Sequence, residues 1–452
     1  MRVTVERDPA VCVSYARDAS GLTRAPEGVV RARESEEVVE LLRESHRDGT
    51  AVTPAGAQTS TTGASISDTG VLLSLRAMSR ILDVDVAART VRVEPGVILG
   101  DLDRAISGEG LFFAPDPTSD QECTIGGAIA CNASGPRTLR YGATRSHVRG
   151  LTVALADGRV LELKRPALEK NTVGYHPAQD PIDWFVGSEG TLGVILAAEL
   201  SLMSRPAVEV GIGMPFPDQA SALAFIVAAR EDASLAPRCL EYFDAEAFRI
   251  ARRDNAAWGE DGDTMVYLEH AGAVEAPFDA WIALAERSHG RVDRTEIFEG
   301  AAALRAARSL RHAVPATMHE RVAPYLAHGG RRVSTDWAVP YRRAAEMLAQ
   351  AETFVREAGI APPVTYGHLG NGHPHQNFVA KDPAEVARCE KVVEQTLHAV
   401  VAMGGTVAAE HGIGKVKAKW LPLQASAMQL GMMRAIKREL DPKGILSPGN
   451  VL

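Results

Sequence analysis

The sequence is poor in groups that carry electrons or crosslink a chain. Its 452 residues include five cysteines, at positions 12, 123, 131, 239 and 389, and no two of them form a Cys-x-x-Cys pair. An odd, scattered set is not typical of a disulfide framework or of an iron–sulfur cluster. Any redox chemistry then has to come from a bound cofactor, and we expect Cys123 and Cys131 to be small buried apolar groups.

The sequence also lacks an excess of positive charge and a long apolar run. A formal net charge of −8 argues against a nucleic-acid backbone as partner. The most apolar stretch, 192–203, is broken by Glu199 and is shorter than the ~20 residues of a membrane-spanning helix. A secretory signal needs an uninterrupted apolar stretch near the N-terminus, and the charged residues at 6–8 lie where that stretch would be. We expect a cytoplasmic protein, with peripheral attachment to the inner membrane face left open.

Small residues are concentrated in three segments, 54–65, 115–144 and 186–195. The first segment is neither a Gly-x-Gly-x-x-Gly fingerprint nor a P-loop, so the two commonest nucleotide folds are not supported. A plain polar turn is the alternative for this loop. A run of Gly, Ala, Ser, Thr and Asn with few large aliphatic side chains cannot form a hydrophobic core by itself. We therefore expect a flat, extended ligand such as a dinucleotide, held in part by backbone N–H groups.

The length predicts two or three domains, because 452 residues exceed the usual size of a single core. Residues 29–56 predict a strand, a helix capped by Ser35 and a second strand, and residues 81–94 predict a hairpin. From about residue 206 the pattern changes to an antiparallel sheet covered by helices, an α+β layer. Its expected strands include 208–214 and 264–268, its expected helices are 217–231, 276–288, 299–320 and 341–358, and a last helix runs from Trp420 to Leu440.

Histidines and a carboxylate flank glycine turns in 367–377 and 410–414. Imidazole and carboxylate groups suit zinc or manganese, and a catalytic site needs about three protein ligands and one open position. We predict His368, His375 and Glu410 as ligands, which leaves His411 as a base. An ordinary hydrogen-bonded role for each histidine is the alternative, and hydrolysis by a metal-bound water is the rival chemistry.

In this order the segments resemble the flavin-dependent 2-hydroxyacid dehydrogenases of the vanillyl-alcohol oxidase superfamily. That group holds D-lactate dehydrogenase, D-2-hydroxyglutarate dehydrogenase and the glycolate oxidase flavoprotein subunit, and the resemblance covers nearly the whole chain. The motifs that carry it are Pro115-Asp-Pro-Thr-Ser, Thr124-Ile-Gly-Gly, Asn132-Ala-Ser-Gly-Pro, Tyr141-Gly, Gly187-Ser-Glu-Gly-Thr-Leu-Gly, Gly367-His-Leu-Gly-Asn-Gly, Glu410-His-Gly-Ile-Gly and Asp441-Pro with Ser447-Pro-Gly.

The resemblance implies an α+β protein with a two-part PCMH-type FAD-binding domain at 1–204. It also implies a cap domain with an antiparallel sheet and the metal site at 205–420, and a C-terminal segment at 421–452 whose helix returns to the FAD domain. The implied FAD contacts are Pro54, Gly56, Ala57, Gln58, Thr59, Ser60, Thr62, Gly63, Ala64, Pro117, Thr118, Thr124, Gly126, Gly127, Ala130, Asn132, Ala133, Gly135, Tyr141, Gly142, Glu189, Gly190, Val194, Ile195 and Asn450.

The implied catalytic residues are His411, Arg311 and Asn377, with Arg308 as the reserve for Arg311. The resemblance implies FAD-dependent oxidation of a D-2-hydroxy acid such as D-lactate to the 2-oxo acid. Hydride goes to flavin N5, a divalent metal assists and His411 takes the proton. Glycolate and D-2-hydroxyglutarate are the other expected substrates. Electrons leave to an external acceptor, namely a quinone, an electron-transfer flavoprotein, a cytochrome or oxygen.

Some positions depart from the pattern of the group. Ala57-Gln58 stands where consecutive glycines are usual, and His373 adds a possible ligand that competes with His375. Ser334 replaces a frequent basic residue, which argues against a long diacid substrate. Two rival functions stay open at this point: a metallohydrolase whose glycine loops bind a nucleotide, and a flavin-binding protein without chemistry. A homodimer is the default expectation.

Overall fold

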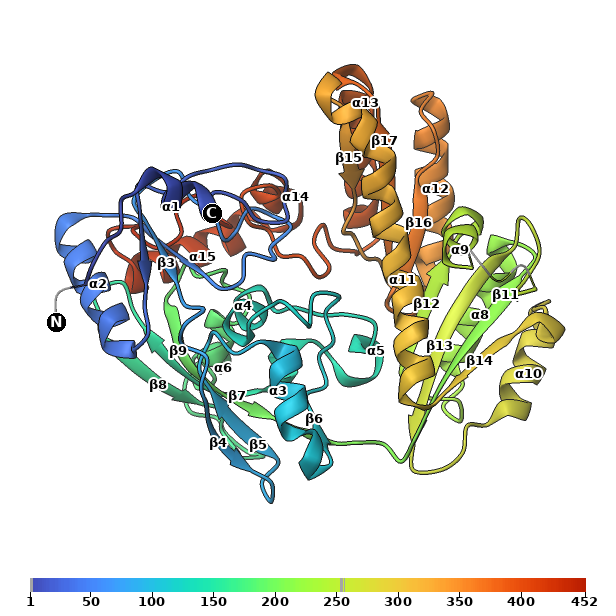
Figure 1. The fold of residues 1–452 in the computed structure, drawn as a ribbon, viewed down its shortest axis with the longest axis horizontal. Helices are drawn as coiled ribbons and strands as arrows, with labels where there is room; N and C mark the ends of the chain where they lie inside the picture. Colours follow the sequence, from blue (N-terminus) through green and yellow to red (C-terminus); the bar gives the residue numbers. More distant parts are fainter. Residues whose placement is uncertain (1–2, 253–254, 256) are drawn as a thin grey trace. The chain divides into compact units, whose positions relative to one another are not determined.

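The computed structural model describes residues 3–252, 255 and 257–452. The chain folds into two compact units, each made of separate chain segments (Figure 1). Unit 1 consists of Met1–Gly135, Gly142–Arg205 and Glu410–Leu452, and unit 2 consists of Pro136–Tyr141 and Pro206–Ala409. Over the described part of the chain, no helix is long and apolar enough to cross a membrane.

Unit 1 contains a three-stranded parallel sheet with the order β1-β3-β2. Its strands are β1 (Gly28–Arg31), β2 (Val52–Ala55) and β3 (Val71–Ser74), and the helix α2 (Ser35–Asp48) joins β1 to β2. The predicted strand, helix and strand are confirmed, but the predicted Ser35 cap is wrong. Glu34 precedes the first turn, and its N–H donates to Glu37 at 3.3 Å, so the cap lies one residue earlier.

The second sheet of unit 1 has five antiparallel strands in the order β4-β5-β9-β7-β8. Its strands are β4 (Ile81–Asp85), β5 (Thr90–Val93), β7 (Val148–Ala154), β8 (Val160–Lys164) and β9 (Val194–Ser201). The predicted hairpin is the pair β4 and β5. The remaining α-helices and strands of the unit's first two segments are α1 (Pro9–Ser14), α3 (Leu99–Ile106), β6 (Leu111–Phe112), α4 (Ile125–Cys131), α6 (His176–Gln179), α7 (Ile182–Phe185) and β10 (Met203–Ser204).

The C-terminal segment packs within unit 1. The helix expected from Trp420 to Leu440 is interrupted, because Ser426 caps a new helix by accepting from the N–H of Gln429 at 3.3 Å. The result is α14 (Leu421–Gln424) followed by α15 (Ala427–Leu440). Beyond it, Ile445 accepts from the N–H of Val52 at 2.8 Å, so the chain end runs along strand β2.

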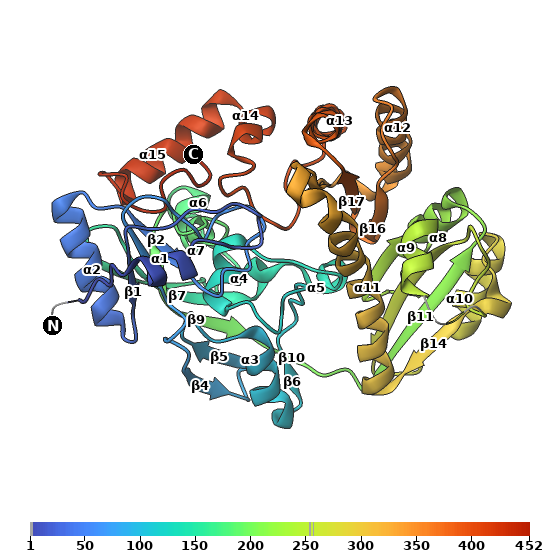
Figure 2. The same ribbon diagram turned by 45° about the horizontal axis from the view of Figure 1, so that its top comes forward.

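Unit 2 is built on a seven-stranded antiparallel sheet with the order β14-β11-β13-β12-β16-β17-β15, which confirms the expected antiparallel layer (Figure 2). The strands are β11 (Val208–Phe216), β12 (Cys239–Phe243), β13 (Thr264–Gly272), β14 (Glu296–Glu299), β15 (Arg331–Ser334), β16 (Val364–His368) and β17 (His373–Ala380). The helices are α5 (Thr138–Tyr141), α8 (Gln219–Glu231), α9 (Ala245–Ala251), α10 (Phe278–Arg287), α11 (Gly300–Val322), α12 (Ala344–Glu357) and α13 (Pro383–Ala402).

Helices cover both faces of this sheet. On one face α9 and the long α11 form a core with Phe243, Tyr267 and Tyr366. On the other face α12 and α13 pack on Phe378, and Phe216 of β11 stacks on α8. The four predicted helices of this region correspond to α8, α10, α11 and α12. They could be predicted because their apolar residues recur with helical spacing.

Candidate active site

Three buried histidines meet on the α11 face of the unit 2 sheet. In the register of β16 and β17, His368 lies opposite His373, and Tyr366 lies opposite His375. Because alternate residues of a strand point to the same face, His373 and His375 both point toward His368. The three residues are 3%, 4% and 8% exposed, and each offers a ring nitrogen within 4.8 Å of the others.

A glycine turn makes this arrangement sterically feasible. Gly372 connects β16 to β17 with a φ of +71°, and a Cβ at this position would lie 2.0 Å from the carbonyl oxygen of Val339. Any other residue would clash there and strain the backbone. The glycine spacing that suggested the site from the sequence therefore has a structural basis.

His373 belongs to the cluster as fully as the two histidines predicted from the sequence. Its Nε2 lies 3.1 Å from Oδ1 of Asp336, which is an ion-pair distance. Among the described residues this buried nitrogen has no hydrogen-bond partner. Such an atom is uncommon in a protein interior and points to a ligand or an ion.

Glu241 and Arg311 surround His368. Nδ1 of His368 lies 2.6 Å from Oε1 of Glu241, a residue of β12 that is 1% exposed. Nε of Arg311, on α11, lies 3.3 Å from Oε2 of the same carboxylate, and an NH2 group of Arg311 lies 3.1 Å from Nε2 of His368. Burial raises the pKa of the Glu241 carboxyl, but His368 and Arg311 outweigh this effect and hold that pKa below its ordinary value.

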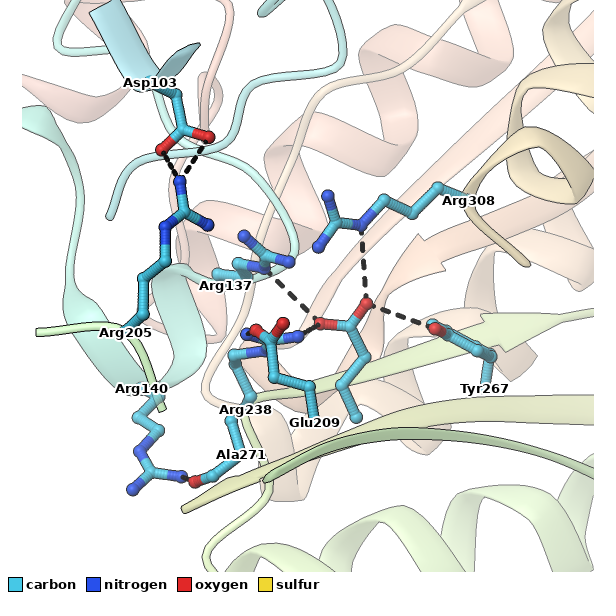
Figure 3. A network of polar contacts seen from close by, with 10 residues as sticks. Asp103, Arg137, Arg140, Arg205, Glu209, Arg238, Tyr267, Ala271 and Arg308 are labelled. Atoms are coloured by element: carbon cyan, nitrogen blue, oxygen red, sulfur yellow. Dashed lines mark hydrogen bonds and ion pairs between the residues drawn. The ribbon is translucent and has the colours of Figure 1, made fainter. Parts of the chain in front are cut away.

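A second buried carboxylate on the same sheet face forms ion pairs with several arginines (Figure 3). Glu269 is 2% exposed and lies 2.6 Å from Arg238 and 3.4 Å from Arg137. It also accepts from the Tyr267 hydroxyl at 3.1 Å and lies 3.6 Å from Arg308. Burial raises the pKa of Glu269, and the arginines more than offset that, so the pKa is lowered. Arg308, the reserve for Arg311, is therefore paired with a different carboxylate.

Glu410 and His411 lie at the start of the third segment of unit 1. Nε2 of His411 lies 3.3 Å from Oε1 of Glu410. Glu410 directly follows Ala409, the last residue of unit 2, and the N–H of Ala409 donates to the carbonyl oxygen of Asp336 at 2.9 Å. Ala409, the residue before Glu410, is therefore hydrogen-bonded to Asp336, and the side chain of Asp336 lies beside His373.

The loop after His411 is held by Glu189. The carboxylate of Glu189 accepts from the N–H of Ile413 at 2.6 Å and from that of Gly414 at 2.7 Å. Burial raises the pKa of this carboxyl although both bonds lower it. Glu189 was predicted to contact FAD, but its carboxylate is occupied by these amides.

The three glycine-rich segments converge in unit 1. A Cβ on Gly56 would lie 2.2 Å from Oγ1 of Thr124, which is the N-cap of α4, so the first two segments touch closely there. The N–H groups of Gly187 and Glu189 donate to the carbonyls of Ile129 and Ala130 at 3.0 Å and 2.8 Å, which joins the second segment to the third. The sequence had suggested only that these segments share one ligand.

Several predicted cofactor residues also shape these segments. Gln58 has a φ of +57°, so it adopts the conformation expected of the missing glycine, and its amide donates to the carbonyls of Tyr15 and Ser65. Asn132 ends α4 with a φ of +50°. Asn450 donates to the carbonyl of Ala64 at 2.8 Å, which ties the chain end to the first loop.

A sequence model described as an FAD binding domain matches residues 26–164, and a model of the C-terminal domain of FAD linked oxidases matches residues 205–451. The chain belongs to the FAD-linked oxidases. The family resemblance inferred from the motifs is confirmed, and the protein is an FAD-dependent oxidoreductase. This result excludes the metallohydrolase hypothesis.

Curated relatives align over almost the whole chain. The glycolate oxidase subunit GlcD of Bacillus subtilis is 30% identical over 97% of this chain and 91% of its own length. The D-2-hydroxyglutarate dehydrogenase of Xanthomonas citri is 31% identical over 99% and 94%, and the D-lactate dehydrogenase of Archaeoglobus fulgidus is 31% identical over 94% and 91%. Among solved structures, an alkyldihydroxyacetonephosphate synthase has the same fold, with a TM-score of 0.76, 18% identity and coverage of 98% and 82%.

Residues missed by the sequence reasoning are mostly buried charges. Glu241, Glu269 and Arg238 were not predicted, because an isolated Glu or Arg in a sequence is most often solvated. Strand alternation in β12 and β13 was the available signal, since it places Glu241 and Glu269 on the face that also carries Tyr267. Of the predicted catalytic residues, Asn377 is buried on β17, two positions after His375 on the same face.

Proposed function

We propose that this oxidoreductase converts a D-2-hydroxy acid of the D-lactate type into the 2-oxo acid, with FAD as the primary electron acceptor. The observation that carries the proposal is the contact at His368. A buried histidine of the cluster touches Arg311 at 3.1 Å, so a group that binds metals and a group that binds carboxylates lie side by side. The relatives named as D-lactate and D-2-hydroxyglutarate dehydrogenases support the same substrate class.

The residues present fit a divalent metal. Three buried imidazoles offer nitrogen atoms within 4.8 Å of one another, and Nε2 of His373 lacks a hydrogen-bond partner among the described residues. We propose His368, His375 and Glu410 as the ligands, with His373 as a fourth candidate. Nitrogen and carboxylate ligands of this kind suit zinc or manganese.

The residues of unit 1 fit FAD. At Gly56 and Gly135 a Cβ would lie 2.2 Å from a neighbouring oxygen, so no side chain fits there and backbone is left to line the site. We propose that unit 1 is the FAD-binding domain and that unit 2 is the cap carrying the substrate site. The segment 421–452 completes unit 1 along β2.

In the proposed reaction Arg311 binds the substrate carboxylate. Its Nε lies 3.3 Å from Glu241, and a guanidinium recognises a carboxylate by paired hydrogen bonds from its planar N–H groups. His411 takes the proton of the substrate hydroxyl, because histidine is the side chain best suited to accept and release a proton at neutral pH. When bound, the metal supplies positive charge at the hydroxyl oxygen, and FAD supplies the two-electron acceptor.

The electrons then leave to an external acceptor. All five cysteines are free thiols, and none has the spacing of a cluster ligand. A quinone, an electron-transfer flavoprotein, a cytochrome or oxygen would complete the cycle.

A turnover assay with a dye as terminal acceptor tests this function. The purified protein is supplied with FAD and Zn²⁺ or Mn²⁺ and is offered D- and L-lactate, glycolate and D- and L-2-hydroxyglutarate. We expect dye reduction with D-lactate, formation of the 2-oxo acid, and loss of turnover after treatment with a chelator. Absence of turnover with every acid, or turnover that survives complete metal removal, would contradict the proposal.

A further inference from the structure

We propose that Glu241 is a positioning residue that orients both the metal ligand His368 and the carboxylate-binding Arg311. The inference rests on the proposed function, since it assigns a task to Glu241 in the same site. In this proposal Glu241 itself touches neither the cofactor nor the substrate. It acts through its two neighbours, each of which touches one oxygen of its carboxylate.

The hydrogen bonds around His368 fix the position of its ring proton. A guanidinium has N–H donors and no acceptor, so the NH2 of Arg311 donates to Nε2 of His368. Nε2 is therefore the unprotonated nitrogen, and the proton is on Nδ1. That N–H donates to Glu241 at 2.6 Å. A metal-binding histidine usually donates its second ring N–H to a carboxylate or a carbonyl in this way.

The same carboxylate also determines how Arg311 presents its donors. Glu241 lies 3.3 Å from Nε of Arg311, while Nη2 of Arg311 lies 3.1 Å from Nε2 of His368, the nitrogen that would bind a metal. A metal ion and this NH2 group cannot both occupy the lone pair of Nε2. Metal binding therefore releases the NH2 group for the substrate carboxylate, and the Nε contact with Glu241 keeps the guanidinium in the site.

One consequence is a coupling between metal and carboxylate binding. If the metal frees a donor of Arg311, a carboxylate binds more tightly to the metal-loaded protein than to the metal-free protein. By linkage, the carboxylate then strengthens metal binding by the same factor. Glu241 is the residue that connects the two events, because it touches both groups.

Glu269 provides a matched control. It lies on the same face of the sheet as Glu241, it is 2% exposed against 1%, and it also pairs with an arginine of α11. Within the described part of the chain the carboxylate of Glu269 contacts Arg137, Arg238, Arg308 and Tyr267, and no histidine of the cluster. A general effect of removing a buried carboxylate would appear in both variants. A positioning effect on His368 would appear only in the Glu241 variant.

The test measures metal affinity rather than turnover. The FAD-loaded protein is stripped of metal, and Zn²⁺ is titrated in competition with a chromophoric chelator for the wild type, Glu241→Gln, Glu241→Asp and Glu269→Gln. We expect about 10- to 100-fold weaker Zn²⁺ binding in Glu241→Gln, partial recovery in Glu241→Asp and wild-type affinity in Glu269→Gln. Flavin absorbance and the unfolding temperature establish that each variant is folded.

A second titration measures the coupling. Pyruvate is added to metal-free and Zn²⁺-loaded protein, and its binding is followed by the perturbation of the flavin spectrum. We expect Zn²⁺ to tighten pyruvate binding in the wild type and to have a clearly smaller effect in Glu241→Gln. If Glu241→Gln unfolds, Glu241→Asp, with its shorter side chain, must still show weaker Zn²⁺ binding.

The outcomes separate this inference from the proposed function. Wild-type Zn²⁺ affinity and coupling in folded Glu241→Gln would overturn the role of Glu241 and leave the proposed function intact. Equal weakening in Glu241→Gln and Glu269→Gln would also overturn it, since the effect would then be structural. A wild-type protein that binds neither Zn²⁺ nor Mn²⁺ would overturn both.

Discussion

The candidate sites of unit 1 and unit 2 are built from different kinds of chemical groups. In unit 1 the glycine-rich segments meet through backbone groups and small side chains, and contacts such as that of Gly56 with Thr124 leave no space for an added atom. In unit 2 the histidines lie among buried charged groups, with Glu241, Glu269 and Arg238 each at most 2% exposed. We therefore expect unit 1 to be sensitive to added atoms and unit 2 to the loss of particular charges and donors.

The largest effect is expected from an added side chain in unit 1. In Gly135→Val the Cβ would lie 2.2 Å from the carbonyl oxygen of Asp116, a backbone atom that cannot rotate away. We expect loss of bound FAD, measured by absorbance after gel filtration, and a destabilisation of about 1–3 kcal/mol or more. The control is Gly431→Ala on α15, where nothing lies within 4 Å. Retention of FAD by Gly135→Val would mean that this segment is not close-packed.

Removal of the proposed base should leave the cofactor site intact and stop the chemistry. For His411→Ala we expect FAD binding as in the wild type, with flavin reduction by D-lactate slowed about 10²- to 10⁴-fold. Anaerobic stopped-flow absorbance measures the rate. A variant that loses FAD would place His411 in the cofactor site instead, and an unchanged rate would remove it from the mechanism.

The three histidines can be ranked by metal affinity. We expect His375→Ala to weaken Zn²⁺ binding about 10- to 100-fold or more, because a proposed ligand is lost. His373→Asn should have a smaller effect, since Asp336 lies 3.1 Å from His373 and competes for it. Equilibrium dialysis with metal analysis gives both values. The reverse order would make His373 the ligand and His375 its support.

The two arginines of α11 should differ in the Michaelis constant. Arg311→Lys replaces a forked donor by a point charge beside Glu241, so we expect KM for D-lactate to rise about tenfold or more with a smaller change in kcat. Arg308→Lys is the matched change one turn earlier, at a side chain that is 40% exposed, and should alter KM about threefold or less. Steady-state kinetics distinguish the two, and equal effects would move the carboxylate site toward Glu269.

Asp244 is a buried carboxyl that pairs with no arginine among the described residues, and its replacement should affect stability alone. Burial raises the pKa of Asp244 to about 6, although its carboxylate accepts from the N–H groups of Ala247 and Thr365. The folded protein therefore disfavours the ionised form, and this group lowers the free energy of unfolding as pH rises from about 4 to 6. Urea unfolding of Asp244→Asn should show a gain relative to wild type that grows over this range, by up to about 3 kcal/mol, and is constant above it. A pH-independent difference would contradict this.

Much of the fold was accessible from the sequence for identifiable reasons. The helices α8, α10, α11 and α12 follow apolar residues with helical spacing, and the hairpin of β4 and β5 follows strict alternation. The glycine-rich segments and the histidine turn could be located because Gly372 and similar residues occupy backbone positions that other residues cannot adopt. The start of α2 was misplaced by one residue, since Glu34 and Ser35 both suit a helix start.

The buried charges of unit 2 could not be found in the same way. Glu241 and His368 are 127 positions apart in the chain, and their pairing depends on the order β12-β16 within the sheet. Glu269 pairs with Arg137, from the six-residue segment Pro136–Tyr141, and with Arg308 of α11. No local sequence pattern indicates that these three residues meet. His373 was regarded only as a competitor of His375, because the sequence does not show that the β16–β17 turn brings all three histidines together.

An anaerobic absorbance titration of the FAD- and Zn²⁺-loaded protein with D-lactate, L-lactate and D-2-hydroxyglutarate tests the proposed function most directly. We expect the visible flavin band to bleach with D-lactate, to persist with L-lactate, and to persist with D-lactate once a chelator has removed the metal. A flavin band that none of these acids bleaches, or that D-lactate bleaches equally well without metal, would contradict the proposed oxidation.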